Sequence, residues 1–472
     1  MSKLARAPLR ECAVLALVSG LALVMAGCGG GGSAPLQPTP SLATPAGPVG
    51  IVADSSAAFV LPQGVDEYQR HLLLATANAG TKPVESPPAP GSAASYDPTA
   101  LRVQWCYTAE HTAFPPELGD RNIVPPTKMF DNMWALGPRW VLQYAFKADS
   151  GKVFLIDTLN NTGEAQTLTE PGLTAIGASG SALIGAMPTH GHGDHFGGAG
   201  YLQKTYGIPI YLGSADAGVG ANATSPFTVT PLDSANLSPQ EMDFGGVRMT
   251  LLSTPGHTVG TFSGIVYPKL SGTEYALAFW GGTGMPGTVS LAMQYLDGSE
   301  RLYRLAAARK VDGTIHTHPF VDGSLEKLDA LNVSPGSYAT ANPFLIGNAL
   351  ALRSLSVLRE CSAAKVAQLD ATAVIPAWHT TTVSVTEAAS LSGVTKVGAA
   401  VKNPFGFVQN GAVTFTLQPD GQVCTSITDA NGQTSCSIPT GAGATSVTAQ
   451  FVQATLPDGT VELASSGSAR VR

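Results

Sequence analysis

Charged residues are scarce in this chain. Only 12% of its 472 residues are Asp, Glu, Lys or Arg, and the formal net charge is −7. No basic run occurs, which argues against nucleic acid as a partner. Beyond Ala26 no apolar run approaches the roughly 20 residues that a membrane-spanning helix needs. Abundant Gly (53) and Pro (34) instead indicate a loop-rich secreted protein that contains β-structure.

The N-terminus has the pattern of a targeting signal. A basic start, residues 3–10, precedes an apolar stretch, residues 12–26, that is too short for a spanning helix. Met25-Ala26-Gly27-Cys28 resembles a bacterial lipobox, in which residues 1–27 are a lipoprotein signal peptide and Cys28 carries the lipid. An ordinary secretory cleavage site is the alternative. The resemblance implies a bacterial cell-envelope protein, anchored by Cys28 in the outer membrane or facing the periplasm.

Residues 28–98 predict a flexible tether followed by an N-terminal extension. The Gly-, Pro-, Ser- and Thr-rich run over residues 29–50 is typical of a linker. One amphipathic helix is expected over residues 66–79, within an extension that we expect to be mobile.

Four cysteines remain after Cys12 in the signal and Cys28: Cys106, Cys361, Cys424 and Cys436. An even number in an oxidising compartment predicts two disulfides. Cys424 and Cys436 form the local pair, and Cys106 with Cys361 would join the start of the main domain to its last helix. The other pairings of these four stay open.

Short β-prone runs alternate with helical runs over residues 99–371. A hairpin is expected from residues 140–146 and 152–157. Further strands are expected at 182–187, 208–212, 247–253, 275–280 and 313–317, and helices at 199–206 and 342–370. Candidate metal ligands follow the carboxyl ends of these strands, where open α/β sheets place their sites.

The stretch Thr189-His190-Gly191-His192-Gly193-Asp194-His195 predicts a metal site. Its glycines let the backbone bend so that alternate side chains converge. His190 and His192 can reach one ion, and Asp194 and His195 can reach a second beside it. Imidazole and carboxylate ligands suit zinc better than magnesium or calcium, while iron and manganese stay open.

HGHGDH at 190–195 and TPGHT at 254–258 resemble the motifs of the metallo-β-lactamase superfamily. The resemblance implies a four-layer αββα sandwich over residues 99–371 that holds two zinc ions. His190, His192 and His257 would bind the first ion. Asp194, His195 and a histidine of the last strand would bind the second.

Two features refine the resemblance. Residues 317–322 resemble the last-ligand region of the β-lactamase subclass whose site has only His and Asp ligands. The resemblance implies that His318 is the last ligand of the second ion. His316, on the same side of the strand, is the alternative. Gly281-Gly282-Thr283-Gly284 stands where most hydrolases of this fold have a bridging Asp and another lactamase subclass has a Cys. This departure disfavours glyoxalase-like, ribonuclease-like and sulfur-dioxygenase-like relatives.

The resemblance implies a hydrolase of a small-molecule substrate. A hydroxide activated by the zinc ions would cleave a cyclic amide, with a β-lactam as the leading candidate, and Asp194 would both ligate zinc and orient this nucleophile. Hydrolysis of another ester, lactone or amide is the alternative within enzymes. An adhesion or binding lipoprotein with a degenerate metal domain is the alternative from another class.

Several other histidine, aspartate and tryptophan residues are considered as candidates, and most are expected to have structural roles. Three histidines without ligand partners at a useful spacing are expected on the surface or in packing: His71, His111 and His379. Asp157 is expected to be a structural carboxylate near the site. Trp134 and Trp140 line either the cleft or the core.

Residues 378–472 predict a small β-sandwich. Strands are separated by regular turns, and Asp429-Ala430-Asn431-Gly432 is expected to be a hairpin turn before a return strand that begins at Cys436. The segment over residues 411–439 resembles bacterial immunoglobulin-like repeats. The resemblance implies a spacer or adhesion module.

Overall fold

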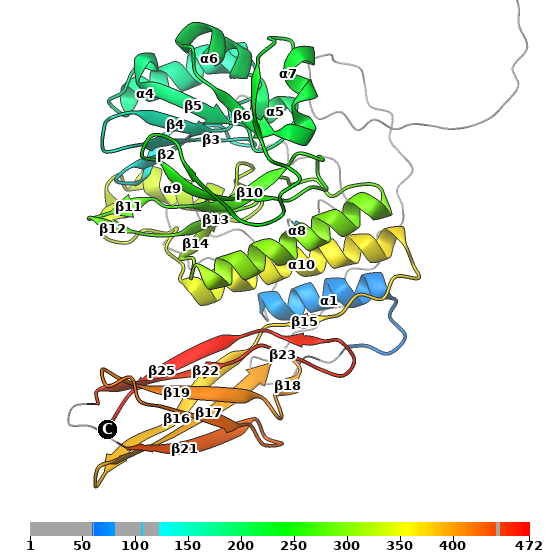
Figure 1. Ribbon diagram of the computed structural model, residues 1–472, viewed down its shortest axis with the longest axis vertical. Helices are drawn as coiled ribbons and strands as arrows, with labels where there is room; N and C mark the ends of the chain where they lie inside the picture. The colour runs from blue at the N-terminus through cyan, green and yellow to red at the C-terminus, as the bar shows by residue number, and fades with distance from the viewer. Residues whose placement is uncertain (1–58, 60, 81–104, 107–121, 440–443) are drawn as a thin grey trace, which may run out of the picture. The chain divides into compact units, whose positions relative to one another are not determined.

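The computed structural model describes residues 59, 61–80, 105, 106, 122–439 and 444–472 (Figure 1). The predicted signal peptide, Cys28, most of the tether and His111 lie outside these residues. Within the described part of the chain, no helix has both the length and the apolar character needed to cross a membrane.

Two β-sheets form the centre of the metal-motif region. In spatial order, the larger sheet contains β1 (Ile123–Phe130), β2 (Met133–Pro138), β3 (Gln143–Lys147), β4 (Val153–Ile156), β5 (Leu183–Met187), β6 (Ile210–Gly213) and β7 (Val229–Leu232). The smaller sheet contains β14 (Gly313–Ile315), β13 (Leu277–Phe279), β10 (Phe262–Val266), β9 (Arg248–Ser253) and β8 (Gln240–Asp243). A short hairpin joins β11 (Lys269–Leu270) to β12 (Thr273–Glu274).

Strand β4 shows how the layers arise. Alternate residues of a strand face opposite sides of its sheet. Val153 and Leu155 join the core that also contains residues of α4 (Glu170–Ala175) and α6 (Ala199–Tyr206). Phe154 and Ile156 join the core between the sheets, where the Phe154 ring stacks on Phe244 with centroids 4.1 Å apart. All four residues are therefore buried, which explains an uninterrupted apolar strand.

Helices cover the outer faces of both sheets (Figure 1). The larger sheet is covered by α4 and α6, and shorter helices lie nearby: α3 (Thr162–Glu164), α5 (Gly193–Phe196) and α7 (Gly218–Asn222). The smaller sheet is covered by α8 (Val289–Ala308) and α10 (Asn348–Leu369), and α9 (Ser324–Val333) precedes α10. The predicted four-layer αββα fold is confirmed.

The last long helix begins later than predicted. We expected it at residue 342, but α10 starts at Asn348. The Asn342 side chain instead accepts a hydrogen bond from the Phe344 amide and donates one to the Met129 carbonyl. Gly347 then adopts φ +83°, which is outside the right-handed helical region, so the helix starts only after it.

The predicted helix at residues 66–79 is confirmed as α1 (Glu67–Ala79), with Asp66 accepting a hydrogen bond from the Gln69 amide as N-cap. The expectation of mobility is wrong for this helix. It packs against α10, where buried His71 Nδ1 lies 2.5 Å from the Glu360 carboxylate. The apolar face of the helix explains this packing, because exposing it would be unfavourable.

The C-terminal region is all-β, as predicted. One sheet contains β16 (Thr382–Leu391), β17 (Val394–Asn403), β18 (Gly406–Phe407) and β21 (Gln433–Pro439). A second contains β20 (Val423–Ile427), β19 (Ala412–Gln418), β22 (Ser446–Phe451) and β25 (Ser465–Arg470). A short third sheet contains β15 (Trp378–His379), β24 (Val461–Glu462) and β23 (Ala454–Thr455). Alternating residues of both larger sheets form one shared core.

The predicted hairpin at residues 429–432 is wrong. The turn forms, with the Gly432 amide donating to the Asp429 carbonyl, but β20 pairs with β19 whereas β21 pairs with β17. The turn therefore carries the chain from one sheet to the other. Both predicted disulfides are present, and Cys424–Cys436 joins these two sheets while Cys106–Cys361 ties residue 106 to α10.

Removing the inter-sheet disulfide is expected to destabilise the C-terminal region. The double substitution Cys424→Ser and Cys436→Ser should lower its free energy of unfolding by about 2–3 kcal/mol, because the bond restricts the unfolded chain. Urea unfolding of the oxidised protein and the double variant measures this difference. Equal midpoints would show that the disulfide adds no stability.

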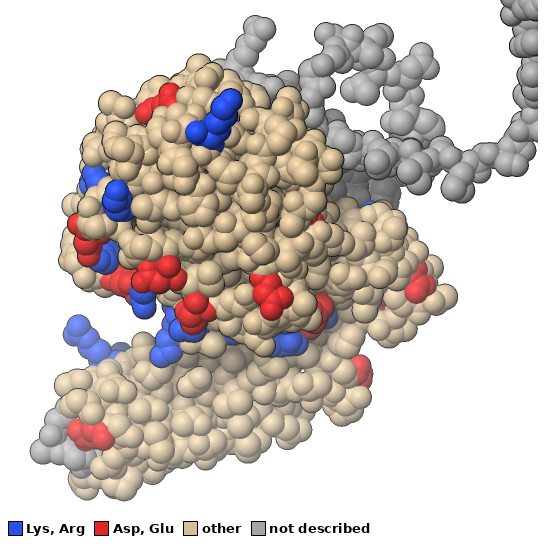
Figure 2. Space-filling model, turned by 45° about the horizontal axis from the view of Figure 1, so that its top comes forward, with Lys and Arg blue, Asp and Glu red and all other residues tan. Residues whose placement is uncertain are grey.

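Charged side chains are few on the face of the molecule in Figure 2, and both signs occur together. Exposed pairs such as Arg248–Glu274 and Lys269–Asp149 place opposite charges within 2.7 Å of each other. This face therefore carries no extended patch of one sign.

Candidate metal centre

Three segments at the carboxyl ends of strands, one of which includes the short helix α5, bring the predicted ligands together. They follow β5, β9 and β14 and carry six side chains: His190, His192, Asp194, His195, His257 and His318. The six form two groups, one of His190, His192 and His257 and one of Asp194, His195 and His318, and the ligand atoms within each group lie within 4.8 Å of one another. The convergence expected from the sequence is therefore present in the structure.

The first group is a triangle of ring nitrogens. His190 Nε2 lies 3.1 Å from His192 Nδ1, and His257 Nε2 lies 3.0 Å from each of these two atoms. Tetrahedral ligands at zinc–nitrogen distances of about 2.0–2.1 Å stand about 3.3–3.4 Å apart, so the triangle has nearly the size of one face of a zinc tetrahedron.

Hydrogen bonds show which ring nitrogen of His257 faces the group without a proton. His257 Nδ1 lies 2.6 Å from the Gly284 carbonyl, which can only accept, so Nδ1 carries the proton and Nε2 presents a lone pair. Burial is the largest cause that lowers the pKa of His257, neighbouring His192 is the next, and together they bring this pKa to about 3. Burial likewise lowers the pKa of His190 well below its usual value. Converging neutral lone pairs repel unless a cation lies between them.

The second group contains the carboxylate. His195 Nε2 lies 3.1 Å from His318 Nε2, and Asp194 Oδ2 lies 3.3 Å from the first atom and 3.5 Å from the second. The other oxygen, Asp194 Oδ1, is buried and accepts no hydrogen bond from a described residue. A buried carboxylate oxygen without a donor is unfavourable, which fits a residue whose partner is a metal ion or water.

His195 is held between two carboxylates. Its Nδ1 lies 2.6 Å from Asp157 Oδ2, and Asp157 Oδ1 accepts a hydrogen bond from the Thr189 amide at 2.6 Å. Burial alone would lower the pKa of His195, but Asp194 and Asp157 outweigh it and raise this pKa to about 10. Asp157 is thus the structural carboxylate that we predicted, and it orients His195 toward the group.

His318, and not His316, lies in the second group. His318 Nδ1 lies 2.6 Å from the Trp140 carbonyl, which leaves Nε2 as a lone pair, and burial, followed by the charge of His195, lowers the pKa of His318 to about 4. His316 instead accepts a hydrogen bond from the His318 amide through Nδ1. Trp140 stacks on His318, which places it at the site, whereas Trp134 belongs to the core.

His71 and His379 have the structural roles predicted for them, whereas His111 lies outside the described residues. His71 is buried beside Glu360, and half-buried His379 lies 2.9 Å from Glu462. Neither belongs to a metal-binding group among the described residues.

The Gly281–Gly284 segment approaches His257 through its backbone. A Cβ atom on Gly282 would lie 2.4 Å from the His257 side chain, so only glycine fits at this position. No carboxylate projects from these four residues, and the Gly284 carbonyl orients the ligand instead.

Sequence reasoning missed this contact and that of the Trp140 carbonyl, because backbone groups leave no residue-type signal. It also missed Asp216, whose only signal is an acidic residue after β6.

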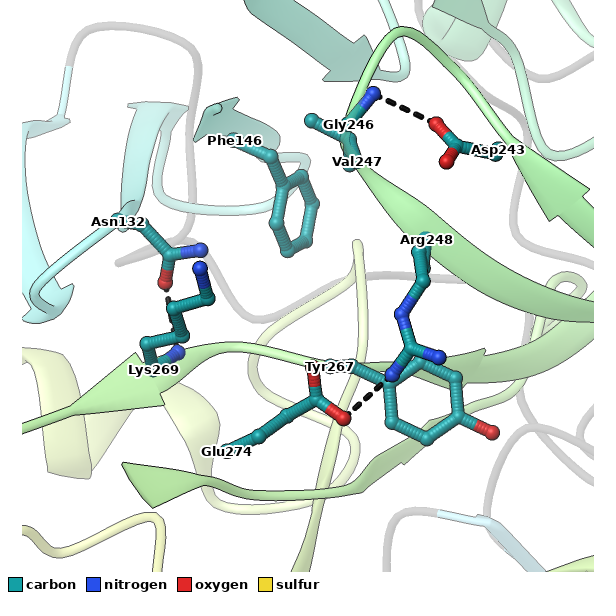
Figure 3. Close-up of a pocket in the computed structure, with 9 residues that line it drawn as sticks. All are labelled: Asn132, Phe146, Asp243, Gly246, Val247, Arg248, Tyr267, Lys269 and Glu274. Atoms are coloured by element: carbon teal, nitrogen blue, oxygen red, sulfur yellow. Dashed lines mark hydrogen bonds and ion pairs between the residues drawn. The ribbon is translucent and has the colours of Figure 1, made fainter. Parts of the chain in front are cut away.

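Two surface hollows do not include the six ligands. One of about 230 Å³ is lined by residues that include Arg248, Tyr267 and Lys269 (Figure 3), and Arg248 stands at the opposite end of β9 from His257. The other, about 420 Å³, is lined by Phe196, Asp216 and neighbouring residues of α7.

Comparisons with known proteins identify the class of domain that carries five of the six ligands. Residues 137–271 match the family model described as the metallo-beta-lactamase superfamily. A hydroxyacylglutathione hydrolase of Acidiphilium cryptum is 35% identical over 88 residues, which are 19% of this chain and 32% of that protein. One of Hahella chejuensis is 29% identical over 120 residues, 25% of this chain and 39% of that protein. The chain thus spans only about a third to two fifths of these curated relatives.

Solved structures with a similar fold include two β-lactamases. A subclass B3 metallo-β-lactamase of Bradyrhizobium japonicum is 21% identical, with 49% of this chain and 90% of that chain covered and a TM-score of 0.40. A mutant metallo-β-lactamase of Legionella gormanii is 16% identical, with 53% and 97% covered and a TM-score of 0.44. The chain contains a metallo-β-lactamase superfamily domain that includes residues 137–271, with the hydrolase fold of that superfamily and two His/Asp groups suited to metal ions.

Proposed function

We propose that this protein is a dinuclear zinc hydrolase that opens a cyclic amide, with a β-lactam as its leading substrate. One observation carries the proposal: six side chains form two adjacent groups of three ligand atoms, one with three histidines and one with two histidines and Asp194. A metal domain that had lost its function would not need to retain all six, which argues against the adhesion alternative.

The protein's own groups have distinct roles in this proposal. When bound, zinc ions supply a water of lowered pKa and polarise the substrate carbonyl. His257 and His318 have pKa values well below 7 and point lone pairs inward, so they act as ligands rather than as acids. Asp194 Oδ2 faces the second group while Oδ1 stays available to accept a hydrogen bond from the attacking water and orient it.

Two observations bear on the substrate. Five histidines and one aspartate, with Gly281–Gly284 in place of an acidic bridge, resemble the all-His/Asp β-lactamase set and support the β-lactam. The curated relatives named hydroxyacylglutathione hydrolases make a glutathione thioester the second candidate. Both reactions place a water on a carbonyl carbon, so the same site serves either.

A substrate panel tests the function. Residues 51–472 with added zinc are assayed against nitrocefin, a carbapenem, a hydroxyacyl-glutathione thioester and a lactone, each with and without a chelator. We expect chelator-sensitive hydrolysis of both β-lactams. Turnover of the thioester alone would replace the β-lactam by the second candidate, and no turnover of any substrate by the zinc-loaded protein would contradict the proposed hydrolase.

Zinc uptake by the second group is expected to release one proton. The pKa of His195 is raised to about 10, so at pH 7 its ring is protonated, and a ligand nitrogen must lose that proton. Affinity for this ion should therefore rise about tenfold per pH unit between roughly pH 5 and 9 and fall as the pH drops. Calorimetry in buffers of different ionisation enthalpy counts the proton, and uptake without proton release would contradict this protonation state.

We also propose that the protein is lipid-anchored through Cys28 in the bacterial cell envelope and acts on a small molecule there. Two disulfides support an oxidising compartment, because cytosolic thiols are usually kept reduced. Metabolic labelling with a fatty acid, compared between the parent and Cys28→Ser, tests the anchor.

A further inference from the structure

Asp216 lies outside the two ligand groups, at the end of the short helical turn Ser214–Asp216 that follows β6. The residue is 7% exposed. Asp216 Oδ2 accepts a hydrogen bond from the Gly191 amide at 2.8 Å and from Thr258 Oγ1 at 2.5 Å, and Oδ1 accepts one from the Gly260 amide at 3.0 Å. One buried carboxylate therefore binds two loops that are far apart in sequence.

These two loops carry the whole first group. Gly191 stands between His190 and His192, and Thr258 directly follows His257. We propose that Asp216 is a positioning residue that holds the three histidines at metal-binding distance by fixing the backbones of both loops. This inference rests on the proposed metal-dependent function, because the triangle of nitrogens matters only if it holds an ion.

The glycines beside Asp216 show how closely the loops approach it. A Cβ atom on Gly191 would lie 2.9 Å from the Asp216 carboxylate, and one on Gly260 would lie 2.6 Å from its Cγ. Real Cβ atoms do not approach this closely, so a side chain at either position would displace the carboxylate. The glycines of the HGH and HTVG stretches thus make room for Asp216 as well as allowing the backbone to bend.

The second group is held by different residues. Asp157 orients His195, and the Trp140 carbonyl orients His318. Each metal-binding group therefore has its own buried carboxylate, Asp157 for the second and Asp216 for the first. Removing acceptors from Asp216 should weaken the first site and leave the contacts of His195 and His318 in place.

The test uses a chain in which only the first group is complete. His318→Ala removes a ligand from the second group, so zinc affinity, measured by competition with a chromophoric chelator, reports the three histidines. Adding Asp216→Asn keeps the side-chain size but removes one acceptor oxygen, and it should lower this affinity by about 10–100-fold, as is usual for groups that orient metal ligands. Thr258→Val removes only one of the three hydrogen bonds and should lower the affinity less.

Cobalt(II) spectra and folding controls separate positioning from general stability. The visible absorption of cobalt in the His318→Ala chain should shift or weaken with Asp216→Asn, because the ligand geometry changes. The exposed Asp233→Asn is the matched control and should change neither affinity nor spectrum. Near-UV circular dichroism of each metal-free variant checks folding. If Asp216→Asn does not fold, the zinc affinity and cobalt spectrum of Thr258→Val provide the test.

The outcomes are distinguishable. No zinc binding by the folded His318→Ala parent would contradict the proposed metal centre itself. Normal binding by that parent, with unchanged affinity and cobalt spectrum in folded Asp216→Asn, would overturn the role of Asp216 alone. If Asp216→Asn does not fold, the same result in Thr258→Val would overturn it.

Discussion

Replacing His257 by alanine is expected to remove zinc from the first group and lower kcat by about a thousandfold or more, since a catalytic metal ion contributes several kcal/mol to the transition state. His257 supplies one of three nitrogens that lie 3.0–3.1 Å apart, and among the described residues its Nε2 lone pair has no partner outside this group. Metal analysis and steady-state kinetics on the same preparation measure both effects.

The matched control is His379→Ala. His379 is also half-buried, but its ring contacts Glu462 in the short sheet of the C-terminal region and belongs to neither metal-binding group. This variant should keep both the zinc content and kcat of the parent. Full activity of His257→Ala with two bound zinc ions would show that His257 is not a ligand.

Glu360→Ala should destabilise the fold by about 3–5 kcal/mol, because it breaks the buried ion pair with Arg359 and leaves the Trp378 amide without its acceptor. Glu360 is fully buried on α10 and contacts Arg359 at 2.7 Å and His71 at 2.5 Å, and it accepts a hydrogen bond from the Trp378 amide. Burial alone would raise the pKa of Glu360, but Arg359 and His71 lower it below its usual value. The carboxylate is therefore charged at pH 7 and joins α1, α10 and β15.

Urea unfolding monitored by circular dichroism measures this loss. Glu387→Ala removes a carboxylate from an exposed pair with Lys396 and should change stability by less than about 0.5 kcal/mol. The zinc content of the folded fraction of Glu360→Ala should equal that of the parent, since Glu360 contacts none of the ligands. Equal stability of the Glu360→Ala and Glu387→Ala variants would show that the buried network adds nothing to the fold.

The sequence was most informative where ligands are close together in the chain. The spacing of His190, His192, Asp194 and His195 alone indicated two ions, because a glycine-rich turn brings alternate side chains together. Predicting His257 and His318 as ligands required the resemblance to a known family, since nothing in their local sequence indicates which distant residues they approach. The structure places His318 in the second group and His316 outside it.

Contacts made by backbone atoms or by long-range packing could not be predicted. Asp216 carries no spacing signal that links it to Gly191 or Gly260, and its role appears only when three loops are placed in space. The turn at residues 429–432 has the composition of a hairpin turn. The strands on either side of it nevertheless pair with different partners, β20 with β19 and β21 with β17. The later start of α10 follows the positive φ of Gly347, and Asn342, which we expected to begin the helix, instead bonds to distant Met129.

The central claim is that two groups of three side chains each hold one metal ion. Anomalous diffraction at the zinc absorption edge, from crystals grown with zinc, tests it most directly. We predict two anomalous peaks about 3.5–4 Å apart, one among His190, His192 and His257 and one among Asp194, His195 and His318. Zinc-containing crystals with no peak at either group would contradict the account.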